Sequence, residues 1–168
     1  MSGVWAFLNG GVVIGSETVV RGAVMKSVRD ILLSKGNNVW SITPDATVYE
    51  ALKTMADKNV GALVVLEGEK VLGIMSERDY ARKVILHGKS SREIPVREIM
   101  SSKVYYVHPE QNIQDCMESM TDKRVRHLPV LENDRLAGII SIGDVVKTII
   151  ADQESTIKHL ENYITGGR

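Results

Sequence analysis

The chain has 168 residues and a mass of 18.6 kDa, which allows one compact unit or two very small ones and excludes a large multidomain enzyme. Its 21 Lys and Arg residues balance 21 Asp and Glu residues, so no overall charge would attract nucleic acid or a basic partner. The single cysteine, Cys116, excludes an intrachain disulfide and a multi-cysteine zinc site, and no apolar stretch approaches the roughly 20 residues of a membrane span.

The first 24 residues are apolar and contain several glycines, but they lack the basic start and the continuous apolar core of a secretory signal. Helical patterning begins only at Met25, in the segment MKSVRDIL. We therefore interpret residues 1–24 as an N-terminal extension. It is either a disordered segment, native or left over from cloning, or a strand that pads the domain.

The chain then repeats itself. Residues 44–79 align without a gap on residues 109–144, at an offset of 65, with 13 identities over 36 positions. Upstream, a lead-in segment at 27–32 (SVRDIL) resembles one at 95–100 (PVREIM) at an offset of 68. We divide the chain into repeat 1 (25–90), repeat 2 (91–151) and a tail (152–168), and we expect the repeats to pack about a pseudo-twofold axis.

Both repeats predict the same elements: a short strand, an amphipathic helix, two strands joined by a polar turn, and a second helix. In repeat 1 we expect them at 39–43, 48–55, 60–66 and 71–76 and from Glu77, and in repeat 2 at 104–108, 113–120, 125–131 and 136–141 and from Ile142. The last helix carries Val145, Val146, Ile149 and Ile150 on its expected apolar side.

The tail places Ile157, Leu160 and Ile164 three and four residues apart. This spacing predicts an added amphipathic helix at the end of the chain. Such a helix either seals its own domain or forms a dimer interface.

A Ser-x-x-Asp motif ends the last strand of each repeat, at Ser76–Asp79 and at Ser141–Asp144. It fits a capping box, in which the serine and the aspartate satisfy free backbone N–H groups where a strand turns into a helix. A carboxylate in such a turn can also accept hydrogen bonds from both hydroxyls of a ribose. The two interpretations are compatible if the serine caps while the aspartate faces outwards.

Adjacent cations interrupt the middle strand of repeat 2, where Arg126 and His127 replace Gly61 and Ala62 of repeat 1. Strand alternation predicts that Arg126 and His127 point to opposite faces, one toward the core and one toward a ligand. Together they form a plausible local anion site. No second metal ligand stands at a suitable spacing from His127, so we do not expect a metal.

A second group of cations, Arg78, Arg82 and Lys83, lies early in one helix, where such a cluster is usually a solvated face. Catalytic motifs are not visible: there is no Walker loop, no G-x-S-x-G elbow and no H-E-x-x-H. Cys116 lies on the apolar face of a helix and reads as a core residue. We therefore expect no catalytic residues and no enzyme.

The ordered set of a proline, an amphipathic helix, VGALVV or VRHLPV, and Gly-Ile-x-Ser-x-x-Asp occurs twice and resembles a tandem pair of cystathionine β-synthase (CBS) domains, over about residues 26–151. The resemblance implies a mixed α/β (α+β) fold of two β-α-β-β-α repeats, a Bateman module, with the C-terminal helix added. It commonly implies a homodimer of modules. It also implies a regulatory adenosyl ligand between the repeats: AMP, ADP, ATP, NAD(H) or S-adenosylmethionine.

The resemblance further implies the binding positions. Asp79 and Asp144 would each hold a ribose in a half-site of their own, with Ser76 and Ser141 nearby. The other expected nucleotide-binding residues are Trp40, Val60, Gly61, Ala62, Tyr105, Val125, Arg126 and His127, with Ser101, Gly143, Arg78, Arg82 and Lys83 assisting. Because Arg126 and His127 belong to repeat 2, we expect repeat 2, with Asp144, to be better equipped for a phosphorylated nucleotide.

The function that this resemblance implies is a cytoplasmic ligand sensor, which changes conformation and signals in trans to a regulated partner protein. We expect neither a membrane nor a nucleic-acid partner. The alternative is a structural or interaction module whose Ser-x-x-Asp turns are only caps. The choice of ligand and the identity of the partner stay open at this point.

Overall fold

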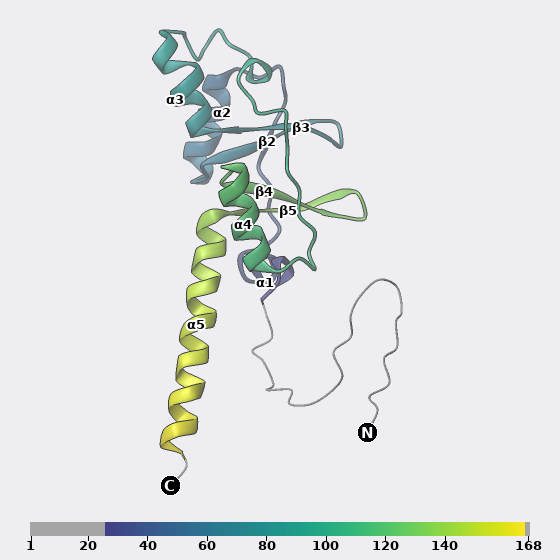
Figure 1. Ribbon diagram of the computed structural model, residues 1–168. Coiled ribbons are helices and arrows are strands. Elements are labelled where there is room, and N and C mark those ends of the chain that lie inside the picture. Colours follow the sequence, from purple (N-terminus) through teal and green to yellow (C-terminus); the bar gives the residue numbers. More distant parts are fainter. Residues whose placement is uncertain (1–25, 167–168) are drawn as a thin grey trace.

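The computed structural model describes residues 26–166, and it shows two stacked α/β repeats from which a long C-terminal helix projects (Figure 1). The predicted extension at 1–24 lies outside the described residues. A lead-in helix, α1 (Val28–Lys35), begins repeat 1 as the sequence divides it. Repeat 1 contains β1 (Ser41–Ile42), α2 (Val48–Lys58), β2 (Ala62–Glu67), β3 (Lys70–Ser76) and α3 (Glu77–Lys83), followed by short 3₁₀ turns at Ile85–His87 and Val96–Glu98. Repeat 2 contains α4 (Ile113–Lys123), β4 (His127–Glu132), β5 (Arg135–Ser141) and α5 (Ile142–Thr165).

The two sheets are nearly equivalent. In repeat 1, β1 runs parallel to β2 and β2 runs antiparallel to β3; in repeat 2, β4 and β5 form the matching antiparallel pair. Both pairs carry a register shift at the same place, between Val65 and Leu66 and between Val130 and Leu131. The repeat in the sequence is therefore a repeat in backbone geometry, down to this irregularity.

The strand expected at 104–108 is wrong, because only Val107 pairs there, through a single parallel bridge to Val130. A proline explains the difference. In repeat 1 the backbone N–H of Val64 donates to the carbonyl of Trp40, at 3.1 Å. Pro129 occupies the position of Val64 in repeat 2 and has no N–H to donate, so the ladder loses this bond and the strand shrinks to a bridge.

Each lead-in segment packs on the other repeat. The side chains of Val28, Ile31 and Leu32 in α1 are buried in the core of repeat 2. Val96 and Ile99 are buried in the core of repeat 1. The division of the sequence assigned each lead-in to the repeat that follows it, whereas the structure exchanges the two segments.

The exchange is fixed by matching backbone hydrogen bonds. The N–H of Val28 donates to the carbonyl of Gln111, at 2.9 Å, and the N–H of Val96 donates to that of Ala46, at 2.8 Å. The two donors, Val28 and Val96, are 68 positions apart, and the two acceptors, Ala46 and Gln111, are 65 positions apart. These separations equal the two offsets of the sequence repeat. The pseudo-twofold relation therefore includes the lead-in segments.

Two glycines make room for the exchanged segments. A Cβ added at Gly138 in β5 would lie 2.7 Å from Cδ2 of Leu32, and one at Gly73 in β3 would lie 2.9 Å from Sδ of Met100 and from the carbonyl oxygen of Ser101. At Gly73 the close carbonyl oxygen belongs to the backbone, so β3 needs a glycine there, whereas at Gly138 a side chain would require Leu32 to shift. This explains why the two glycines stand at equivalent positions.

The tail is not a separate helix, because α5 runs for 24 residues from Ile142 to Thr165 without interruption. Ser141 caps its start, and no proline or glycine follows Gly143 until Gly166. Val145 is buried, but Val146 and Ile150, expected on the same apolar side, are exposed. The helix therefore has an apolar face that its own repeat does not cover.

Replacing Leu32 by alanine is expected to lower the free energy of unfolding by about 2–4 kcal/mol, because its buried side chain fills the contact with Gly138. Leu33→Ala is the matched control, since Leu33 is 78% exposed and Leu32 only 6%. Urea unfolding of both variants measures the difference. Equal losses would contradict the docking of α1 on repeat 2.

Candidate functional site

Two cavities lie where the repeats meet, and they are related by the pseudo-twofold axis. The Asp79 pocket has a volume of about 420 Å³ and is lined by the end of β3, the start of α3, the 101–105 segment and the start of β4. The Asp144 pocket has a volume of about 390 Å³ and is lined by the equivalent segments, the end of β5, the start of α5, residues 35–40 and the start of β2. Each pocket thus takes its aspartate from one repeat and its opposite wall from the other.

The sequence-predicted residues divide between these pockets, with the exception of Gly143, which lines neither. The Asp79 pocket is lined by Ser76, Arg78, Asp79, Arg82, Lys83, Ser101, Tyr105, Val125, Arg126 and His127. The Asp144 pocket is lined by Trp40, Val60, Gly61, Ala62, His127, Ser141 and Asp144.

The pairing of acid and cations differs from the expectation. Arg126 of repeat 2 lies in the pocket of Asp79, so the better-equipped site for an anion is not that of Asp144. The sequence predicted that each half-site is built within one repeat, whereas each pocket is lined by residues of both repeats. The structure packs the sheets so that the turn before β4 faces the β3–α3 turn of the other repeat.

Asp79 is held by both oxygens. Its Oδ2 accepts hydrogen bonds from the backbone N–H of Ser76, at 3.0 Å, and from the Ser76 hydroxyl, at 2.7 Å. Its Oδ1 accepts from the Ser101 hydroxyl, at 3.3 Å, and pairs with Nζ of Lys83, at 2.9 Å. The capping box is therefore confirmed, and the aspartate does not simply face outwards: a ribose would compete with Ser101 and Lys83 for Oδ1.

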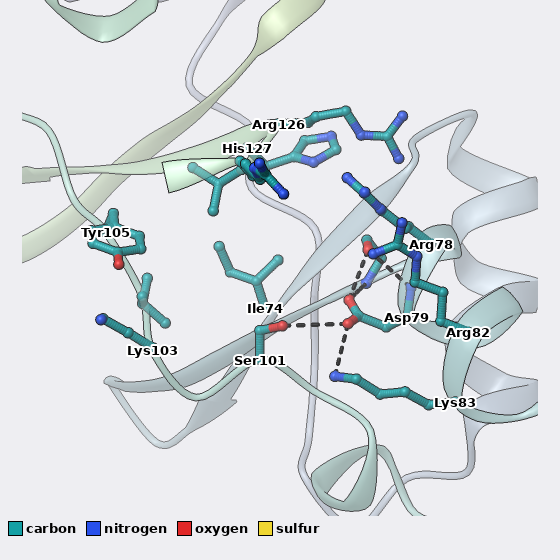
Figure 2. A pocket seen from close by; sticks show the side chains of 14 residues that line it. Ile74, Arg78, Asp79, Arg82, Lys83, Ser101, Lys103, Tyr105, Arg126 and His127 are labelled. Carbon is teal, nitrogen blue, oxygen red and sulfur yellow. Dashed lines mark hydrogen bonds and ion pairs between the residues drawn. The ribbon is translucent and has the colours of Figure 1, made fainter. Parts of the chain in front are cut away.

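The Asp79 pocket is strongly cationic. Six Lys and Arg side chains line it beside one carboxylate: Arg78, Arg82, Lys83, Lys103, Arg124 and Arg126. Figure 2 shows Arg78, Arg82 and Arg126 gathered at one end of the cavity, with Tyr105 at the other end. An aromatic ring, a carboxylate and a cluster of guanidinium groups thus follow one another along the cavity, an arrangement suited to an extended anion with an apolar end.

The sequence predicted Arg126 inside a strand, but β4 begins only at His127, so Arg126 lies just before the strand. Arg126 and His127 therefore do not alternate across the sheet, and both line the Asp79 pocket. His127 also lines the Asp144 pocket. Burial lowers the pKa of His127, the charges of Arg126 and Lys35 lower it further, and Asp144 opposes them, so the imidazole is neutral near pH 7.

Asp144 pairs with a lysine from the lead-in helix. Its Oδ2 accepts from Nζ of Lys35, at 2.7 Å, and from the backbone N–H and hydroxyl of Ser141, at 2.8 and 2.9 Å. Burial raises the pKa of this carboxyl, but the bonds from Lys35 and Ser141 outweigh it and hold the pKa below its ordinary value. With Lys35 against its carboxylate and no arginine in its wall, the Asp144 pocket is nearly neutral.

Sequence reasoning missed several lining residues. In the Asp79 pocket they are Ile74, Lys103, Val104 and Arg124, and in the Asp144 pocket Lys35, Gly36, Asn38, Asn59, Ile139 and Ile140. Arg124 was detectable, because it occupies the position of Asn59, and both end a helix in the left-handed conformation, at φ 53°. Asparagine tolerates this conformation better than arginine does, so Arg124 combines local backbone strain with a place in the pocket.

Two further observations concern the residues from Lys26 to Gly166. Within them, no group of three or more His, Cys, Asp or Glu side chains is arranged to hold a metal ion. None of their helices combines the length and the apolar character that crossing a membrane requires.

Asp144→Asn is expected to reduce the free energy of unfolding at pH 7, and this loss is expected to vanish in acid. A carboxyl with a lowered pKa stabilises the fold above its ordinary value of 3.8, and the contribution disappears as the pH falls through the folded-state pKa. Urea unfolding between pH 7 and pH 3 measures it. Asp134→Asn in the exposed β4–β5 turn is the control, and a loss independent of pH would contradict the ion pair with Lys35.

Comparison with known proteins gives consistent matches. The CBS domain profile matches residues 28–85 and 96–151. The chain is 40% identical over 151 residues to the mitochondrial CBS domain-containing protein CBSX3 of Arabidopsis thaliana, covering 84% of this chain and 73% of the relative. This relative is named for its CBS domains and not for an enzymatic activity.

Solved structures agree. A CBS-domain protein of Burkholderia ambifaria, named for an inferred role in signal transduction, is 50% identical with a TM-score of 0.74, covering 76% of this chain and 96% of that one. The hexameric CBS-CP12 protein of bloom-forming cyanobacteria is 31% identical with a TM-score of 0.64, covering 72% and 69%. With two matched domains, a 40% identical relative and the observed fold, this chain belongs to the family of proteins with two CBS domains in tandem.

Proposed function

We propose that this CBS-domain protein is a regulatory sensor that binds an adenine nucleotide in the Asp79 pocket and signals in trans by a change in conformation. The observation that carries the proposal is the clustering of six Lys and Arg side chains with one aspartate and Tyr105 in a cavity between the repeats. In a chain with balanced charge, such a concentration favours a ligand with several negative charges.

The pocket offers a place for each part of a nucleotide. The phosphates lie among Arg78, Arg82 and Arg126, whose planar forks suit phosphate oxygens. The ribose hydroxyls donate to Asp79 Oδ1 in place of Lys83 and Ser101, while Nζ of Lys83 keeps its hydrogen bond to the carbonyl of Ile99, at 2.6 Å. The adenine lies near Tyr105 at the other end of the cavity.

The charge of the pocket selects among adenosyl ligands. ATP, ADP and NAD(H) carry several phosphate charges, AMP carries fewer, and the sulfonium of S-adenosylmethionine is positive. Repulsion by the six cations disfavours S-adenosylmethionine. We therefore place the polyphosphates and NAD(H) first, AMP second, and S-adenosylmethionine last.

The position of the pocket provides the signalling step. Its walls come from both repeats, so a ligand that bridges Asp79 of repeat 1 and Arg126 of repeat 2 favours one relative position of the repeats over another. A partner protein that contacts both repeats would read this shift. We propose that the assembly is a homodimer. The hexameric CBS-CP12 protein supports this only as an example of a CBS-domain protein that oligomerises.

Asp79→Asn is expected to weaken ATP binding, because the single amide oxygen is needed as the acceptor for Ser76, which leaves the NH2 donor facing the ribose hydroxyls. Asp144→Asn makes the same change in the equivalent capping box and is the matched control. Isothermal titration of nucleotide-free protein with ATP, ADP, AMP, NADH and S-adenosylmethionine measures the affinities. A wild-type protein that binds none of them would leave the interaction module as the better description, and an effect confined to Asp144→Asn would place the site in the other pocket.

Arg126→Gln is expected to weaken ATP about tenfold or more and AMP less, because it removes a charge-assisted hydrogen bond to a terminal phosphate. Arg135→Gln removes an exposed arginine at the start of β5, outside both pockets, and is the control. The same titrations at low and high salt measure the contribution of charge. Equal losses for ATP and AMP would contradict the placement of the phosphates at Arg126.

A further inference from the structure

Helix α5 has two apolar faces. One face packs on the core of repeat 2 through Ile142, Val145 and Ile149. The other, outward face lies beside the first around the helix, and its apolar side chains are between 41% and 78% exposed. These side chains are Val146, Ile150, Ile157, Leu160 and Ile164.

The outward face follows a heptad repeat. With Gln153 included, its residues are spaced by four, three, four, three and four positions. Equivalent positions recur every seven residues, at 146, 153 and 160 and at 150, 157 and 164, which is the repeat of a left-handed coiled coil. The three isoleucines, Ile150, Ile157 and Ile164, occupy every a position, and Val146, Gln153 and Leu160 occupy the d positions.

The second half of α5 is exposed along its whole length, although Gln153, Ser155, Thr156 and His159 line shallow cavities that Lys26 also lines. Every residue from Gln153 to Thr165 is exposed, and Figure 1 shows this half of the helix extending beyond both repeats. No salt bridge within residues 26–166 involves this segment. An isolated helix of this length is marginal in water, so a partner for the apolar face would supply the missing stability.

The pattern indicates which partner and which orientation. In parallel coiled coils, isoleucine at a with leucine at d favours two strands, and Ile157 and Leu160 form such a pair. In that arrangement Gln153 faces Gln153 of the other copy, and the two amides can hydrogen-bond and fix the register. An antiparallel arrangement would bury Gln153 against Ile157 and leave its amide without a hydrogen-bond partner in the seam.

We propose that the a/d face of α5, from Val146 to Ile164, forms a parallel coiled coil with the same helix of a second copy of this chain. The helix begins at the Ser141–Asp144 cap and therefore starts at the wall of the Asp144 pocket. This coiled coil is the contact surface of the homodimer in the proposed function. It forms without a nucleotide.

The test is the association state of the full-length chain without nucleotide. Sedimentation velocity is expected to show a dimer for the wild type, and Ile157→Glu is expected to weaken it about 100-fold or more by placing a charge in the seam. Ser155→Glu adds the same charge at an f position, on the opposite side of the helix, and is expected to leave the dimer intact. Far-ultraviolet circular dichroism and urea unfolding of repeats confirm that each variant is folded.

Cysteine cross-linking tests the orientation. Leu160→Cys is expected to form a disulfide-linked dimer under mild oxidation, because equal d positions are adjacent only in a parallel pair. Ser155→Cys is the control and is expected not to cross-link. The native Cys116 is buried, which raises its pKa to about 11, so the wild type is expected to stay uncross-linked.

Three outcomes would overturn the proposal: a monomeric wild type, a dimer that survives Ile157→Glu, or a dimer in which Leu160→Cys does not cross-link. The second outcome places the dimer contact on another surface, and the third makes the helices antiparallel. Asp79→Asn is included in the sedimentation series and is expected to leave the dimer unchanged. A failure to bind nucleotide would therefore be distinguishable from a failure to form the coiled coil.

Discussion

The exchange of lead-in segments is the constraint on which the rest of the structure depends. Each repeat alone is a small two-layer unit. Its core is uncovered at the glycine of β3 or β5, Gly73 or Gly138. The lead-in of the other repeat closes it, with Leu32 against Gly138 and Met100 against Gly73. Because each core is completed by a segment of the other repeat, the two repeats stay associated, and a ligand between them can change their relative position only by a small rotation.

This packing gives two pockets of similar architecture and different chemistry. The Asp144 pocket is lined by Asn59, Gly61 and Ala62. At the equivalent positions the Asp79 pocket is lined by Arg124, Arg126 and His127. Both pockets have a capping box and a similar volume, but the side chains that line them differ in charge. A single ligand class therefore need not fill both, and the charge difference supports one phosphate-binding site beside a nearly neutral one.

The continuous helix α5 joins this site to the end of the chain. Its first turn carries Asp144, its first two turns pack on repeat 2, and its second half is exposed. A rotation of repeat 2 about the ligand would move the whole helix, since it has no break after the cap. Ligand site and proposed dimer contact thus share one rigid element.

Much of the fold was predictable from the sequence, because apolar periodicity and Ser-x-x-Asp are local properties: the helices, the hairpins, the caps and the two-repeat organisation are confirmed. One strand failed because Pro129 removes a single hydrogen bond donor, a local signal that was available and overlooked. The residues of the candidate site were also largely predictable, since local turns place Asp79 and Asp144 at helix starts. Only tertiary structure decided that Arg126 faces Asp79, that the lead-ins are exchanged and that α5 leaves an apolar face uncovered, because these depend on which surfaces of two similar repeats meet.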